Sequence, residues 1–366
     1  MRASISGAHG RRRLRLPWIR AASCLIAAPL AACDYPTELP QLESRWVLPG
    51  TDTRFGVDDL LPADVELTPS GDAFLVHFDP VAFDETLGGL CPPCIALNGL
   101  TVPKPLILDS FGATIAFPAE VTSIELLSGD ARIELQNGLG FDPIRPAAGV
   151  FGEITVTLTD DADGEVLATV TIDGAATAFP SGTTLNRTAS LGAATIEGSV
   201  LARVFVDSPP GDPVTIDISN QVAATVVLDN VVVTSVTILV DGTVVSLDPV
   251  ALDVADIDES IEDNIVDGAL VLEVANPFGV GADVQVTIAG SGFAPIQKAA
   301  TVGPEPESTI IIPMTAEEFQ TFLGEESVTL TGTATVDQAA PPIAVLPGQE
   351  LVIIANLDIT LLLSDD

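Results

Sequence analysis

The chain contains one ordered series of short segments twice. The recurring pairs are residues 78–84 and 247–253, 128–140 and 267–279, 153–158 and 283–288, 206–207 and 336–337, and 225–229 and 354–358. One such match would be weak, whereas five collinear matches indicate an internal duplication. We therefore predict two homologous units, residues 57–235 and 236–366. The first unit carries an insertion, residues 85–117, that the second lacks.

Each unit alternates apolar and polar residues. Ile154, Val156 and Leu158 fall on one side of a segment whose other side is mostly threonine. This period of two is typical of a half-buried antiparallel strand. Turn-forming pairs separate the segments, at Asp163-Gly164, Asp173-Gly174, Asp241-Gly242 and Pro347-Gly348. The predicted fold class is all-β, with two tandem duplicated antiparallel β-sandwich-like units.

Two further patterns refine this prediction. The long apolar stretches 223–233 and 351–363 indicate central strands or strand pairs. Helix is expected to be minor. The best helical candidate is residues 315–323, in which Thr315 and Glu318 are spaced as a capping box.

Residues 268–279 (GALVLEVANPFG) form an alternating strand followed by Asn276-Pro277. This segment resembles late-embryogenesis-abundant type 2 proteins, also called WHy domains. The resemblance implies immunoglobulin-like β-sandwiches that bind or protect without catalysis. Asn276 would end a strand and Pro277 would stop its ladder. The first unit departs from the pattern, because Asn137 is followed by glycine. An alternative is an elongated, curved sheet like that of tubular lipid-binding proteins, which normally packs around a long helix.

The first 32 residues differ from the rest. Six arginines and no acidic residue precede a 12-residue apolar stretch, residues 21–32, which is too short to span a membrane and suits a signal peptide. The stretch ends in Leu30-Ala31-Ala32-Cys33, which resembles the lipobox of bacterial lipoproteins. We expect cleavage before Cys33, lipidation of that cysteine and a linker over residues 33–56. The protein would then be extracytoplasmic and held at the inner or outer membrane by lipid.

Charge excludes one class of partner. With the signal peptide removed, eight basic residues remain against 51 acidic ones, a net charge of −43. Such a surface repels nucleic acid and anionic lipid headgroups. Since 47% of the chain is hydrophobic, it is not a disordered acidic tail.

Cys91-Pro-Pro-Cys94 is the sharpest local motif. A Cys-x-x-Cys pair can be redox-active when it opens a helix. Here Asn98, Gly99 and Pro103 disfavour a helix. Outside the cytoplasm a thiol pair oxidises. We therefore predict a structural disulfide that closes the insertion loop, with extracytoplasmic thiol redox activity as the alternative.

The turn at residues 160–165 (DDADGE) resembles part of a calcium loop, with candidate ligands Asp161, Asp163 and Glu165. It lacks the distant bidentate glutamate. Because it lies between two strand-like segments, we interpret it as an acidic hairpin turn. No cofactor is expected, and calcium is the alternative.

Catalytic groups are sparse. His9 lies in the signal peptide, so His77 is the single histidine of the mature chain, and the duplicated unit has Ser246 near that place. There is no phosphate-binding glycine loop and no multi-histidine zinc motif. These observations favour a non-catalytic, lipid-anchored envelope protein that binds or scaffolds another envelope protein. The alternative is a carrier of lipid or another apolar ligand.

Overall fold

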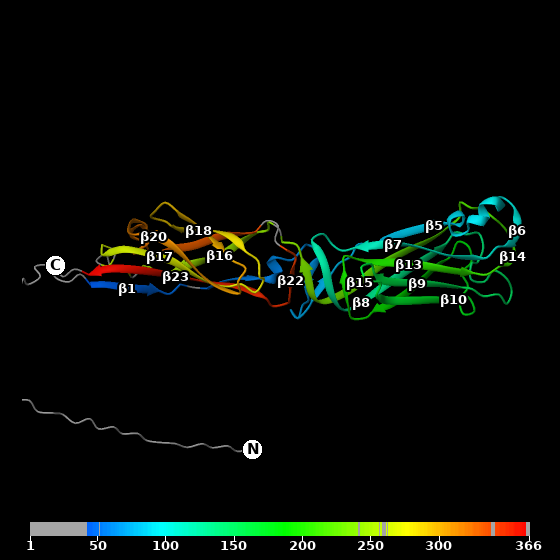
Figure 1. Cartoon of the computed structure of the whole chain (residues 1–366), viewed down its shortest axis with the longest axis horizontal. Coiled ribbons are helices and arrows are strands. Elements are labelled where there is room, and N and C mark those ends of the chain that lie inside the picture. Colours follow the sequence, from blue (N-terminus) through cyan, green and yellow to red (C-terminus); the bar gives the residue numbers. More distant parts are fainter. Residues whose placement is uncertain are drawn as a thin grey trace, which may run out of the picture. The chain divides into compact units, whose positions relative to one another are not determined.

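The computed structural model describes residues 42–50, 52–240, 242–255, 257, 261, 263–337 and 341–363. Cys33 and the signal segment lie outside these ranges. The described chain consists mainly of antiparallel sheets (Figure 1), which confirms the predicted all-β class. It forms two bodies. The first body contains residues 57–240 and strand β22 (Ile343–Val345), and the second contains residues 42–56, 242–337 and 350–363.

The first body has two main sheets. One has the strand order β10-β9-β13-β7, and the other has the order β11-β8-β15-β4-β3, with β5, β12 and β22 also paired to its members. The strands are β3 (Val65–Leu67), β4 (Phe74–Val76), β5 (Val81–Thr86), β7 (Ile107–Ala116), β8 (Val121–Asn137), β9 (Glu153–Asp160), β10 (Val166–Asp173), β11 (Thr184–Leu191), β12 (Ala194–Glu197), β13 (Ser199–Ser208), β15 (Gln221–Ile238) and β22 (Ile343–Val345). Strands β6 (Thr101–Lys104) and β14 (Gly211–Thr215) pair separately.

The second body repeats this plan. Its sheets have the orders β19-β18-β21-β16 and β20-β17-β23-β1, and β2 also pairs with β23. The strands are β1 (Leu42–Leu48), β2 (Asp52–Gly56), β16 (Val244–Leu252), β17 (Ile265–Ala275), β18 (Ala282–Gly290), β19 (Ile296–Val302), β20 (Glu307–Thr315), β21 (Val328–Val336) and β23 (Glu350–Leu363). Strand by strand, β7, β8, β9, β10, β11, β13 and β15 therefore correspond to β16, β17, β18, β19, β20, β21 and β23.

The cores form as the alternation predicts. In β9, Ile154, Val156 and Leu158 are buried and the threonines between them point outward. Two clusters of buried aliphatic and phenylalanine side chains form the cores, and the first cluster also contains Phe55, Val245, Phe278 and Val336 of the second body. Burying these side chains on the inner faces of paired sheets is the main stabilising contribution.

Helices are short. They are η1 (Val57–Asp59), α1 (Leu87–Leu90), η2 (Pro92–Leu97) and α3 (Ala316–Phe322). The capping box predicted for α3 is present, since the Thr315 hydroxyl accepts from the Glu318 amide and the Glu318 carboxylate accepts from the Thr315 amide.

The second body is interrupted in sequence. Strands β1 and β2 pair with β23, so Leu42 lies opposite Leu363 (Figure 1, blue and red). All of the first body except β22 is thus inserted between β2 and β16. The sequence analysis placed residues 33–56 in a linker and described the units as tandem. For residues 42–56 the linker was wrong, and the units are nested. Cross-strand partners more than 300 residues away leave no local sequence signal.

Three boundaries also change. β7 occupies the place of β16, so residues 107–116 of the predicted insertion belong to the common plan. The matched segments 78–84 and 247–253 are not equivalent, because β5 pairs with β15 whereas β16 pairs with β21. The first unit also runs past residue 235, since β15 continues to Ile238 and pairs there with β22.

Candidate functional site

Asn137 and Asn276 occupy equivalent strand ends and make the same contacts. The Asn137 side-chain amide donates to the carbonyls of Phe141 and Phe179, and its oxygen accepts from the Leu139 amide. Asn276 donates to the carbonyls of Val280 and Gly303 and accepts from the Phe278 amide. Both side chains are buried.

This shared geometry gives the strand-end motif a structural role. Each asparagine fastens the turn after its strand to the segment that leads into the neighbouring strand, β11 or β20. With both amide hydrogens and the oxygen engaged, the groups are satisfied internally, as buried polar groups must be.

Asn137 is followed by Gly138 rather than by a proline for a local reason. The Gly138 amide donates to the Gln221 carbonyl at 2.9 Å, and a Cβ at Gly138 would lie 2.7 Å from that oxygen. Proline has no amide hydrogen and would clash there, so the first body cannot carry the Asn-Pro form.

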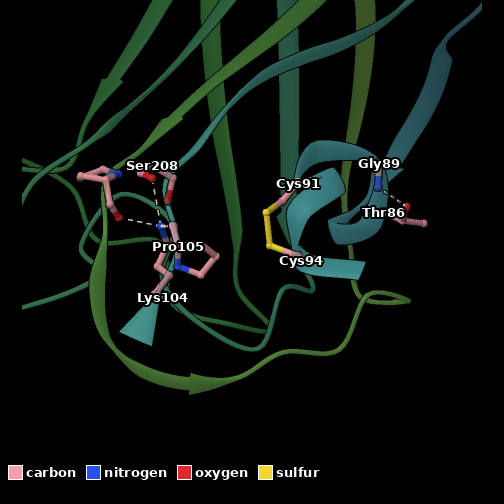
Figure 2. Close-up of a disulfide and its surroundings, with 8 residues drawn as sticks. Thr86, Gly89, Cys91, Cys94, Lys104, Pro105 and Ser208 are labelled. Carbon is pink, nitrogen blue, oxygen red and sulfur yellow. Dashed lines mark hydrogen bonds between the residues drawn. A yellow bond between two sulfur atoms is a disulfide. The ribbon is translucent and has the colours of Figure 1, made fainter. Parts of the chain in front are cut away.

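Cys91 and Cys94 form a disulfide between α1 and η2 (Figure 2). Both residues are buried, and the Thr86 hydroxyl caps α1 by accepting from the Gly89 amide. The disulfide predicted from the sequence is therefore present. Its burial leaves the sulfur atoms poorly placed for exchange with an external thiol.

Lys104, which no sequence motif indicated, is a fully buried lysine at the end of β6. Its ammonium donates to the carbonyls of Pro105, Ser208 and Pro209 (Figure 2). Burial lowers the pKa of Lys104 from 10.5 to about 8, while Asp207 opposes the shift. Lys104 is one of two lysines in the chain, which was the only available signal.

The acidic turn uses its carboxylates internally. Buried Asp160 accepts from the amides of Ala162 and Glu197, and Asp163 accepts from the Glu165 amide. Asp161 accepts from the Ser199 hydroxyl. Within the described ranges, no group of three or more histidine, cysteine or carboxylate side chains is placed to hold a metal ion.

His77 is solvent-exposed, and its Nε2 lies 3.3 Å from Glu66 Oε1. It borders an open hollow of about 280 Å³ that also contains Asp64 and Phe117. Asp79 and Thr114 also line this hollow.

An apolar cavity of about 50 Å³ lies among Phe55, Phe278 and Leu351. Pockets that bury drug-sized ligands span roughly 300–1,000 Å³. This cavity is therefore too small for an acyl chain. A larger hollow of about 480 Å³, near Glu273 and Glu307, is open to solvent and partly polar.

The sequence matches no protein-family model and no curated protein. Among solved structures, it is similar to a protein of Parabacteroides distasonis ATCC 8503 described as secreted, with 12% identity, a TM-score of 0.31, and coverage of 86% of this chain and 99% of that one. It is also similar to peptide:N-glycanase F, with 12% identity, a TM-score of 0.17, and coverage of 77% and 95%. Both scores are too low to support an argument about function. In the described part of the chain, no helix is long and apolar enough to cross a membrane.

Proposed function

We propose that the chain is a lipid-anchored, non-catalytic envelope lipoprotein whose β-sandwich bodies bind or scaffold another envelope protein. The observation that carries this proposal is Leu30-Ala31-Ala32-Cys33 at the end of a basic and apolar leader. The first strand begins at Leu42, so the lipid would be attached nine residues before the folded body. A diacylglyceryl group together with an N-acyl chain is enough for stable attachment.

Labelling with palmitate tests the anchor. We expect the full chain to incorporate palmitate and to fractionate with membranes, and Cys33→Ser to do neither. Cys24→Ser is the matched control, because Cys24 lies in the same leader and should not affect labelling. Labelling that persists in Cys33→Ser, or fails in the unaltered chain, would refute the anchor.

The apolar-carrier alternative is weakened by the small size of the apolar cavity. Mass spectrometry of lipids that co-purify with a soluble form lacking the leader separates the two functions. We expect no stoichiometric lipid. A reproducible one-to-one lipid would favour the carrier.

A further inference from the structure

Among the described residues, no strand covers the outer edge of β1. In the first body, β4 holds the corresponding place beside β15, and its far side is covered by β3 in antiparallel pairing. In the second body β1 pairs with β23, and no strand in the described ranges pairs with its far side. The two copies of one plan therefore differ by one strand at this edge.

The other sheet edges of the two sandwiches differ from the edge at β1. There, an edge strand of one sheet lies against an edge strand of the facing sheet, as for β10 with β11, β5 with β7, β19 with β20 and β2 with β16. The main partner of β1 is β23 alone. An edge strand with unpaired amides and carbonyls is a template for another strand.

The side chains along β1 suit such an addition. Trp46 is 44% exposed and Val47 is 58% exposed, although both belong to a strand. They point to opposite faces of the sheet, because successive side chains alternate. Each face of β1 thus offers an apolar contact for alternate side chains of an added strand.

The charged residues around β1 indicate the charge of the partner segment. Glu43 on β1 is exposed, and Arg45 on β1 already pairs with Asp358. Before β17, Asp253 and Asp263 are exposed, and the Leu362 amide of β23 donates to the Asn264 carbonyl. After residue 32 the chain carries 51 acidic residues against eight basic ones. Complementary charge steers association toward a cationic partner.

We propose that β1 binds an extended, basic segment of a partner protein as an additional antiparallel strand. The proposal rests on the proposed binding function and gives it a place and a partner chemistry. In β3, which covers the equivalent edge, the pattern is Val65-Glu66-Leu67, with Val65 buried and Glu66 exposed. The partner segment would keep this apolar alternation and carry lysine or arginine at the outward positions.

The probe is a synthetic peptide, Thr-Val-Lys-Leu-Lys-Val-Thr, titrated against the mature acylated protein in detergent micelles. Trp46 is the only tryptophan after residue 32, so its fluorescence reports on β1 without labelling. We expect saturable binding and slower hydrogen exchange of the β1 amides. A peptide with glutamate in place of lysine, and one N-methylated at alternate residues, should each bind at least about fivefold more weakly, because charge attraction or ladder hydrogen bonds are lost.

Variants at one position sharpen the test. Val47→Lys should weaken binding of the basic peptide by about fivefold or more, because like charges would then meet. Val47→Thr, which keeps β propensity, should leave binding nearly unchanged. Binding that ignores both N-methylation and Val47→Lys would reveal only polyelectrolyte attraction and would overturn the proposal.

Two other occupants give distinct results. Protection of the β1 amides that rises with protein concentration, without peptide, would assign the edge to a second copy. Protection that disappears when residues 35–41 are deleted would assign it to the protein's own segment between Cys33 and β1. Either result would overturn the proposal. The same titration on unacylated residues 34–366 separates failure at this edge from failure of the lipid anchor.

Discussion

At the scale of single residues, the buried Asn137 and Asn276 show which side-chain contacts the two bodies share. Asn137 and Asn276 sit in different local sequences, yet each joins three backbone groups across a turn. The sequence predicted that both end a strand. It could not predict the partner carbonyls of Phe179 and Gly303, because these come from segments that only the folded sheets bring near.

Replacing the buried Asn137 should lower the stability of the protein. We expect Asn137→Ala to lower the free energy of unfolding by about 2–4 kcal/mol, since buried carbonyls and an amide lose their partner. Asn137→Asp should behave similarly, because a carboxylate cannot donate. Urea denaturation measures the change. Asn186→Ala, at an exposed position, is the control and should stay within about 0.5 kcal/mol. Equal losses of stability for Asn137→Ala and Asn186→Ala would contradict a stabilising role for the Asn137 hydrogen bonds.

The lowered pKa of Lys104 predicts that the stability of the fold depends on pH in the alkaline range. Its pKa in the folded protein is about 8, below its ordinary 10.5, so the unfolded chain binds the proton more tightly. Stability should therefore rise as pH increases from about 8 to 10.5, by about 1–3 kcal/mol. Lys104→Met should lose this rise. Urea denaturation of both proteins at pH 7.5 and 10 measures this, and an identical rise in the variant would exclude Lys104 as its source.

At the scale of elements, alternation and turn pairs predicted the interior strands well. β9, β18, β15 and β23 appear where the period of two or the apolar stretches indicated, and α3 begins at its predicted cap. The same rules failed for β1 and β2. Their sequences alternate weakly over few residues, and their place is fixed by pairing with β23, which is distant in sequence.

The disulfide stabilises a short element rather than the whole body. A closed loop of about four residues reduces the entropy of the unfolded chain by only about 2 kcal/mol at 25 °C. We expect Cys91→Ala/Cys94→Ala to lose about that amount in urea denaturation and to keep the β-rich circular dichroism spectrum. The oxidised protein should show no thiol-disulfide exchange with a small thiol on the timescale of minutes. Rapid exchange would instead favour the redox alternative.

At the scale of the whole molecule, nesting makes the second body depend on both ends of the chain. A chain that lacks residues 57–241, with Gly56 joined to Gly242 by a short glycine-serine linker, should fold, because β2 and β16 already lie against each other. Residues 242–366 alone should not fold, since β23 then loses β1 and β2. Circular dichroism and cooperative urea unfolding distinguish the two. Equal stability of both chains would contradict the pairing.

Nesting also sets an order of events during synthesis. Apart from β22, the two main sheets of the first body are complete once residue 240 has emerged, so their strands can pair early. β1 emerges first of all and must wait for residues 357–363, the last strand to arrive. Pairings of such high sequence separation form slowly and expose unpaired edges meanwhile. The chain therefore matures from its middle outward, and its first and last strands close the molecule together.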